Sequence, residues 1–251
     1  MSTPLAIDSR GTGGLPILFA HSFAGDSSHW TPTLEHLQSR CRVIAFDFHG
    51  HGKSPPAHGR YSYEELAKDI SAVADAEQLD RFVLVGHSMG AAIAAEYAAR
   101  HASRVKALVL VDAPPAPGAV PPGQIRQIHD ALEKDPYAVV EQFWSQQMFI
   151  DARPEVRQRL LSALRRLPRN ATIELTREAF AVDSSLALRR YPGPKFAIVT
   201  PRNDAPLSLH NAVPDVTHAI VSGTGHWIHL DDPAAFNRAL DEFLKRISHT
   251  P

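Results

Sequence analysis

The sequence predicts an α/β fold: a doubly wound, mostly parallel sheet of about seven or eight strands, with helices on both faces and a helical lid. Two observations lead to this prediction. Short apolar runs alternate with segments of helical periodicity, which is typical of parallel strands joined by crossover helices. In contrast, residues 124–188 show helical patterns without a strand, which is the layout of an inserted cover over a site.

The first half of the chain alternates regularly between the two kinds of element. The predicted strands are residues 16–20, 42–46, 82–85 and 105–111, and the predicted helices are residues 30–38, 63–78 and 91–100. In the helix at 63–78, Leu66, Ile70 and Val73 recur at helical spacing and predict one buried face. Residues 91–95, mostly alanine, predict close packing of the next helix against the sheet.

The pattern changes after residue 112. Five prolines and two glycines among residues 113–123 exclude any regular element there. Helices are then predicted at residues 124–133, 136–147, 153–166 and 171–181, before the sheet resumes with strands at 195–200 and 219–221. We therefore expect a core formed by residues 1–113 and 191–251, with residues 114–190 inserted between two core strands as the lid.

The most informative motif is Gly86-His87-Ser88-Met89-Gly90, which lies between a predicted strand and a predicted helix. A serine at the tip of such a sharp turn adopts a strained backbone conformation, and a Cβ on either flanking residue would crowd the neighbouring chain. The helix start also places backbone N–H groups near the serine oxygen, where they can stabilise an anion. Ser88 is therefore a candidate nucleophile, whereas an ordinary glycine-rich turn is the alternative interpretation.

A nucleophilic serine needs a base, and the base needs an acid to orient it. His226 follows the predicted strand at 219–221, and Asp204 follows the strand at 195–200, so both side chains leave strands at their carboxyl ends. Asp112 also ends a strand and is an alternative acid. Asp204 is preferred because of its later position in the chain and its Asp-x-Pro turn.

These motifs together resemble the α/β-hydrolase superfamily, in particular its small lidded serine esterases and enol-lactonases. The resemblance rests on residues 20–25, 47–54 and 86–90, with Asp204 and Gly225-His226, and it extends over nearly the whole chain. It implies that Ser88 is the nucleophile, His226 the general base and Asp204 the orienting acid.

The same resemblance implies an oxyanion hole formed by the backbone N–H groups of Phe23 and Met89, and a loop-bracing role for His21. Ser22 stands where the family usually has glycine, which affects the shape of this loop. For substrate binding, Trp144 and Trp227 are candidates, although lid aromatic residues could equally form the core of the lid.

Other histidines and the lid arginines give weaker signals. His49 and His51, together with His21, could suggest a metal cluster, but they lack a cysteine or carboxylate at the usual spacing, so no metal is expected. His87 and His229 are interpreted as packing residues. Arginines between residues 153 and 169 form a basic helix side, which we interpret as a solvated face, with an anion-attracting funnel as the alternative.

The composition of the chain bears on its class of partner and on its cellular compartment. The 251 residues carry a formal net charge of −1, which argues against a dedicated nucleic-acid binder. No apolar run is long enough to span a membrane. A single cysteine and the absence of a signal-peptide pattern favour the cytoplasm. We expect a monomer or homodimer that acts on a small-molecule substrate without a cofactor.

The sequence thus predicts a serine hydrolase that cleaves a small carboxylic ester or lactone through an acyl-enzyme on Ser88. C–C bond hydrolases, perhydrolases and lyases are an alternative, because a complete triad does not distinguish reactions that are specified by the pocket. A small-ligand receptor with residual hydrolysis is an alternative of another class.

Overall fold

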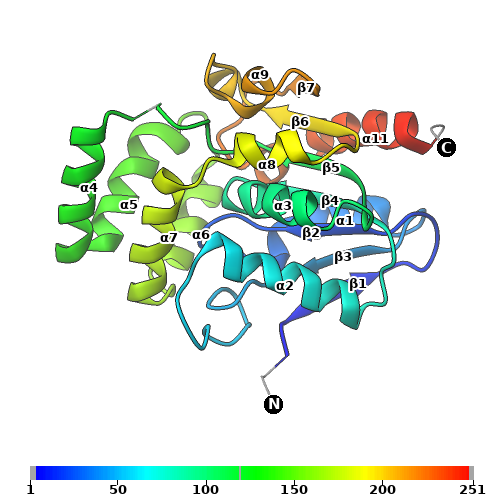
Figure 1. Cartoon of the computed structure of the whole chain (residues 1–251), viewed down its shortest axis with the longest axis horizontal. Helices are drawn as coiled ribbons and strands as arrows, with labels where there is room; N and C mark the ends of the chain where they lie inside the picture. The colour runs from blue at the N-terminus through cyan, green and yellow to red at the C-terminus, as the bar shows by residue number, and fades with distance from the viewer. Residues whose placement is uncertain (1–3, 119, 249–251) are drawn as a thin grey trace.

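The computed structural model describes residues 4–118 and 120–248 and is built around one seven-stranded sheet (Figure 1). The strand order is β1-β3-β2-β4-β5-β6-β7, and all pairs are parallel except β1 with β3. The strands are β1 (Ile7–Arg10), β2 (Ile17–Ala20), β3 (Val43–Phe46), β4 (Phe82–His87), β5 (Val105–Val111), β6 (Lys195–Val199) and β7 (Val216–Ile220). The predicted doubly wound, mostly parallel sheet is confirmed.

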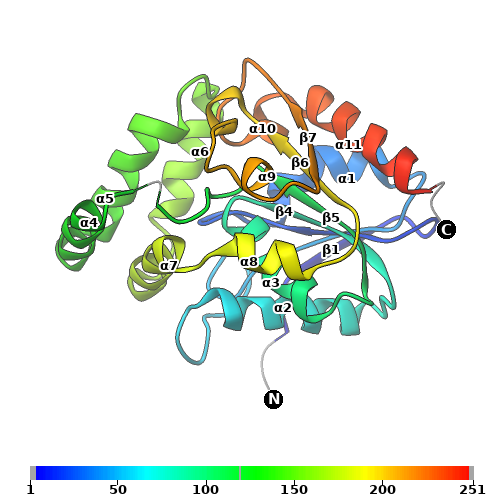
Figure 2. The ribbon, with the colours of Figure 1, turned by 45° about the horizontal axis from the view of Figure 1, so that its top comes forward.

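Helices cover both faces of the sheet (Figure 2). One face carries α2 (Tyr63–Ala76), α3 (Met89–Arg100) and α8 (Ser184–Arg190), and the other carries α1 (Thr31–Leu37) and α11 (Pro233–Ser248). Side chains alternate along the strands, so that Leu84 packs toward the α3 face while Val83 and Val85 pack toward the α1 face. The central strands are buried on both sides, which explains their almost entirely apolar sequences.

Helix α11 is an element that the sequence analysis did not predict. Its buried side chains Phe236, Leu240, Phe243 and Ile247 recur at intervals of three or four residues, and they pack against β6 and α1. This periodicity is the ordinary signature of an amphipathic helix and was available in the sequence. Short elements complete the core: 3-10 helices at Ser27–Trp30 and Pro201–Asn203, α9 (Leu209–Ala212) and α10 (Ile228–Asp231).

The predicted helical insertion lies beyond one end of the sheet (Figure 1). It contains α4 (Pro122–Lys134), α5 (Pro136–Phe143), a π-helical turn (Trp144–Met148), α6 (Pro154–Leu164) and α7 (Arg169–Ala181). Helix α8, which the expected bounds place in the insertion, packs against α3 of the core. Within the described ranges, no helix is both long enough and apolar enough to cross a membrane.

Candidate active site

Ser88 occupies the sharp turn between β4 and α3, with φ of 52° and ψ of −118°. Positive φ is costly for a residue with a side chain, and the flanking glycines make the turn possible. A Cβ on Gly86 would lie 2.3 Å from the carbonyl oxygen of Gly90, and a Cβ on Gly90 would lie 2.3 Å from that of His21. The Ser88 N–H donates to the Val111 carbonyl at 2.8 Å. The turn is therefore fixed both by its own glycines and by the neighbouring strand.

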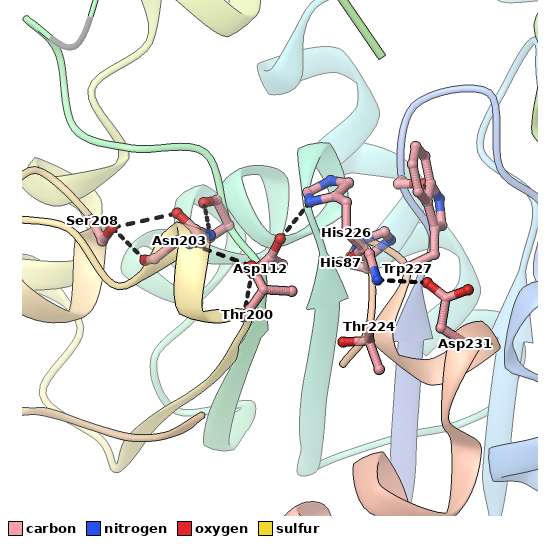
Figure 3. A network of polar contacts seen from close by, with 12 residues as sticks. His87, Asp112, Thr200, Asn203, Ser208, Thr224, His226, Trp227 and Asp231 are labelled. Carbon is pink, nitrogen blue, oxygen red and sulfur yellow. Dashed lines mark hydrogen bonds and ion pairs between the residues drawn. The ribbon is translucent and has the colours of Figure 1, made fainter. Parts of the chain in front are cut away.

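His226 lies in the loop after β7, and its side chain meets a buried carboxylate, that of Asp112 (Figure 3). The distance between Nδ1 of His226 and Oδ2 of Asp112 is 2.6 Å. Because a carboxylate only accepts hydrogen bonds, Nδ1 carries the proton in this pair. In the neutral imidazole, Nε2 then has a free lone pair and can accept a proton from another group.

Asp112 follows β5 and is held by the next strand of the sheet. Its second oxygen, Oδ1, accepts hydrogen bonds from the backbone N–H of Thr200 at 2.9 Å and from the Thr200 hydroxyl at 3.1 Å. The Asp112 backbone has φ of 42°, a conformation in which aspartate is among the more tolerated residues. Both carboxylate oxygens thus have partners, and the carboxylate stabilises positive charge on His226.

The loop that carries His226 is braced from three sides. Its backbone N–H donates to the carbonyl of Met148 at 3.2 Å, and its carbonyl accepts a hydrogen bond from Nε2 of His87 at 3.0 Å. The preceding Gly225 N–H donates to the buried carboxylate of Asp231 at 2.9 Å. Asp231 and Thr200 thus position the His226 loop and Asp112, and no periodicity or motif in the sequence marks either residue.

On the other side of Ser88, the turn after β2 presents Phe23. His21 braces this turn as expected: its Nδ1–H donates to the Ser22 carbonyl at 2.7 Å, and its Nε2 accepts from the Phe48 N–H at 3.0 Å. Met89 is the first residue of α3, so its N–H has no partner within the helix. Phe23 and Met89 lie on the two sides of Ser88 and line the same cavity.

A cavity of about 830 Å³ lies between the sheet and the helical insertion. Ser88, His226 and Asp112 line it, together with Phe23 and Met89. This volume falls within the range that is usual for small-molecule sites. The structure thus brings the predicted nucleophile, base and oxyanion residues to one cavity.

Trp144 and Trp227 also line this cavity, and they contact each other with ring centroids 5.3 Å apart. Trp144 is only 5% exposed and packs edge-on against Phe23, so it belongs both to the cavity wall and to the apolar core. Trp227 donates its indole N–H to the Ser22 hydroxyl at 3.2 Å. Ser22, which replaces the usual glycine, therefore helps to hold the aromatic wall of the cavity.

Comparison with known proteins agrees with this geometry. The sequence profile described as alpha/beta hydrolase fold matches residues 16–177. The chain belongs to this family. A putative carbamate hydrolase, RutD, from Variovorax paradoxus is 27% identical over 98% of the chain and 97% of its own length. A solved structure of an enzyme that degrades N-acyl homoserine lactones is 25% identical, covers 95% and 96% of the two chains and gives a TM-score of 0.81.

Some alpha/beta hydrolase relatives match this chain only locally. The dihydrolipoyllysine-residue acetyltransferase component of the acetoin cleaving system from Pseudomonas putida is 37% identical over 40% of the chain. The match covers 27% of the length of that relative. This likeness concerns one part of a larger protein.

Within this alpha/beta hydrolase, the prediction that Asp204 partners His226 is wrong. Asp204 lies on the surface after β6, and its Oδ1 accepts hydrogen bonds from His210 and Asn211, both at 3.0 Å. These bonds, that of His210 foremost, lower the pKa of Asp204. The carboxylate within hydrogen-bond distance of His226 is Asp112, the alternative that the strand ends also allowed.

Two other histidines lie near the site: His87, which donates to the His226 carbonyl, and His229, which packs among aromatic rings. His87 lies with its ring centroid 4.7 Å from that of His226, and His229 stacks on Trp30 at 4.2 Å. Burial holds the pKa of His87 and of His229 well below the ordinary histidine value, and the nearby His226 lowers both further. Both side chains are therefore uncharged neighbours of His226 at neutral pH.

The arginines of the helical insertion have local partners. Arg165 pairs with Glu141, Arg159 donates to the Ser28 hydroxyl at 2.8 Å, and Arg157 lies over the ring of Phe149. None of these three arginines lines the cavity that contains Ser88. Their arrangement favours a solvated, self-paired face over an anion-attracting funnel.

Proposed function

We propose that this alpha/beta hydrolase is a serine hydrolase that cleaves small, uncharged carboxylic esters or lactones through an acyl-enzyme on Ser88. The observation that carries the proposal is the buried His226–Asp112 pair, with its 2.6 Å contact, beside a nucleophile turn on the same cavity. The similarity to a carbamate hydrolase and to a lactone-degrading enzyme supports hydrolysis at a carbonyl centre.

In the proposed reaction, the Ser88 hydroxyl attacks the substrate carbonyl while Nε2 of His226 takes its proton. Asp112 holds the imidazole in the Nδ1–H tautomer and stabilises the positive charge that forms. The N–H groups of Phe23 and Met89 bind the oxyanion, and each such donor typically contributes ~3–4 kcal/mol to lowering the barrier. His226 then protonates the leaving alcohol, and a water molecule repeats the two steps on the acyl-enzyme.

The cavity wall supports an uncharged substrate. Apart from Asp112 and His226, Arg202 is the single charged side chain among the described residues that line it. The rest of the wall is largely apolar, with five glutamines from the covering helices: Gln124, Gln127, Gln142, Gln146 and Gln147. Amide groups on an apolar wall suit neutral acyl chains with a few polar atoms, and Arg202 leaves one place on the described wall where a negatively charged group could pair.

The test uses the full chain and p-nitrophenyl esters, a lactone series, aryl carbamates and a vinylogous diketone. We expect Ser88→Ala to lower kcat at least ~10³-fold, and Ser9→Ala, an exposed serine of β1, to have no effect. A fluorophosphonate probe should add its mass to Ser88 in the parent chain only. Full activity of Ser88→Ala refutes the proposal, C–C cleavage without an acyl-enzyme favours the alternative reactions, and tight ligand binding without turnover favours a receptor.

A further inference from the structure

A second group of polar side chains lies outside the cavity described above. Asp204 comes from the loop after β6, His210 from α9, and His218 from the edge strand β7. One ligand atom from each lies within 4.8 Å of the other two, and the rings of His210 and His218 are 4.5 Å apart. His210 is buried, whereas Asp204 and His218 are exposed.

We propose that Asp204, His210 and His218 form a binding site for a divalent transition-metal ion of the Zn²⁺ type. Two imidazoles and one carboxylate are a ligand set that zinc commonly uses in proteins, where the fourth position is taken by water. At His49 a carboxylate is also present, since Asp69 lies 2.6 Å from its Nδ1, but no third ligand atom from the described residues joins that pair. No sequence pattern marks the proposed site, since its three residues follow no standard ligand spacing.

The existing distances are close to those that the ion requires. Zn–N and Zn–O bonds of about 2.0–2.2 Å at tetrahedral angles place neighbouring ligand atoms roughly 3.3–3.5 Å apart. Nε2 of His210 and Oδ1 of Asp204 are already 3.0 Å apart. The third atom, from His218, needs to approach by at most about 1.5 Å, the difference between the 4.8 Å limit and this spacing. Its exposed side chain can rotate to do so, and solvent can supply the remaining ligand.

The surroundings favour a metal more than a simple ion pair. Asn211 donates to Oδ1 of Asp204 at 3.0 Å and to the Ala205 carbonyl at 3.0 Å, so the carboxylate is oriented by a neighbour in the way that outer partners orient metal ligands. The chain also offers a comparison: His36 and Asp241 form an exposed pair at 2.9 Å that lacks a second histidine. A metal ion binds better than a simple His–Asp ion pair forms only where a third ligand is present, and His218 provides that ligand here.

The position of the site gives the ion a structural role. Asp204 lies four residues after Thr200, whose N–H and hydroxyl hold Asp112. Between them, Asn203 donates its side-chain N–H to the Ala113 carbonyl at 2.9 Å. A metal bound to Asp204 would tie this loop to α9 and β7, on the side away from Asp112.

The experiment measures metal binding directly and does not depend on hydrolysis. The full chain, treated with a chelator, is titrated with Co²⁺, read by its visible d–d absorption, and with Zn²⁺ in competition with a chromophoric indicator. We expect one equivalent to bind and the melting temperature to rise with metal concentration. His218→Ala and Asp204→Asn should each weaken binding more than about 10-fold.

His36→Ala is the matched control and should bind as the parent does, and His226→Ala tests whether the ion binds in the cavity instead. Unchanged affinity in both His218→Ala and Asp204→Asn overturns the proposal, as does loss of binding in His226→Ala alone. His218 is exposed on an edge strand, so its substitution should leave the fold intact, and circular dichroism of each variant checks this.

Discussion

Replacing Asp112 with asparagine is the sharpest test of the proposed catalytic machinery. The carboxylate accepts a hydrogen bond from Nδ1 of His226 at 2.6 Å and keeps Nε2 free to take a proton. The side-chain amide of the Asp112→Asn variant can present an N–H to Nδ1, which favours the opposite tautomer, and it carries no charge to stabilise the imidazolium. We expect folded protein with a much lower kcat.

The size of the effect follows from the geometry. The charge centres of a hydrogen-bonded carboxylate and imidazolium lie ~4 Å apart, and at an effective dielectric constant of about 20 their attraction is ~4 kcal/mol. If the transition state loses this attraction, the rate should fall about a thousand-fold, because each ~1.4 kcal/mol corresponds to a factor of ten. The wrong tautomer adds to this loss, and the corresponding substitution in a serine protease lowers kcat by ~10⁴. We therefore expect a decrease of ~10³- to 10⁴-fold.

The assay is steady-state hydrolysis of a p-nitrophenyl ester, with Asp204→Asn as the matched control. Asp204 has its own partners, His210 and Asn211, on the surface, so its substitution should change kcat less than about three-fold. The reverse result, in which Asp204→Asn inactivates the enzyme and Asp112→Asn does not, would refute the assignment.

Three further predictions concern the cavity wall and the buried histidines. Trp144→Ala should shift the preferred acyl chain length, and it should lower the free energy of unfolding by ~3 kcal/mol or more because the side chain is 5% exposed. Activity against esters of different chain length measures the first effect, and urea unfolding measures the second. An unchanged chain-length preference would show that Trp144 does not contact the substrate. Ser22→Ala should cost ~1–3 kcal/mol by leaving the Trp227 N–H unpaired, and unaltered tryptophan fluorescence would argue against this contact. Burial lowers the pKa of His51 to about 3, so below about pH 6.5 the unfolded chain binds a proton that the folded chain does not. The contribution of His51 to stability is therefore complete above about pH 6.5, and the free energy of unfolding falls by ~1.4 kcal/mol per pH unit as the pH drops toward 3. In His51→Gln, unfolding should take up one proton fewer over this pH range, so the free energy of unfolding should depend less steeply on pH. An equal slope in both proteins would count against the buried, uncharged state of His51.

The sequence predicted those parts of the site that depend on local chain geometry. Ser88 needs glycines at fixed positions on a strand-to-helix turn, and His226 needs a strand end, and both requirements are visible in the residues. The sheet and the helices of the insertion follow from periodicity, which also could have revealed α11.

The acid could not be chosen in this way, because Asp112 and Asp204 follow β5 and β6, which are neighbours in the sheet. The end-of-strand rule therefore places both carboxylates near His226. What distinguishes them is the direction of each side chain, set by the positive φ of Asp112, its bonds to Thr200 and the capture of Asp204 by His210. The bonds of Asp112 join residues far apart in the sequence, and the backbone turn that brings His210 to Asp204 follows no motif, so neither is visible in the spacing of residues.

The link between the core and the covering helices consists of an anchored stretch followed by a glycine with open space around it. Just after Asp112, the Ala113 carbonyl accepts from Asn203, and the Ala116 N–H donates to the Leu207 carbonyl at 2.7 Å. Gly118 follows with φ of 99° and open space around its Cβ position. A displacement of α4 and α5 that rotates the chain at Gly118 would leave the anchored residues before it in place. Asp112 therefore stays held by Thr200 in such a displacement, whereas His226, whose N–H donates to the Met148 carbonyl of the covering segment, is coupled to it.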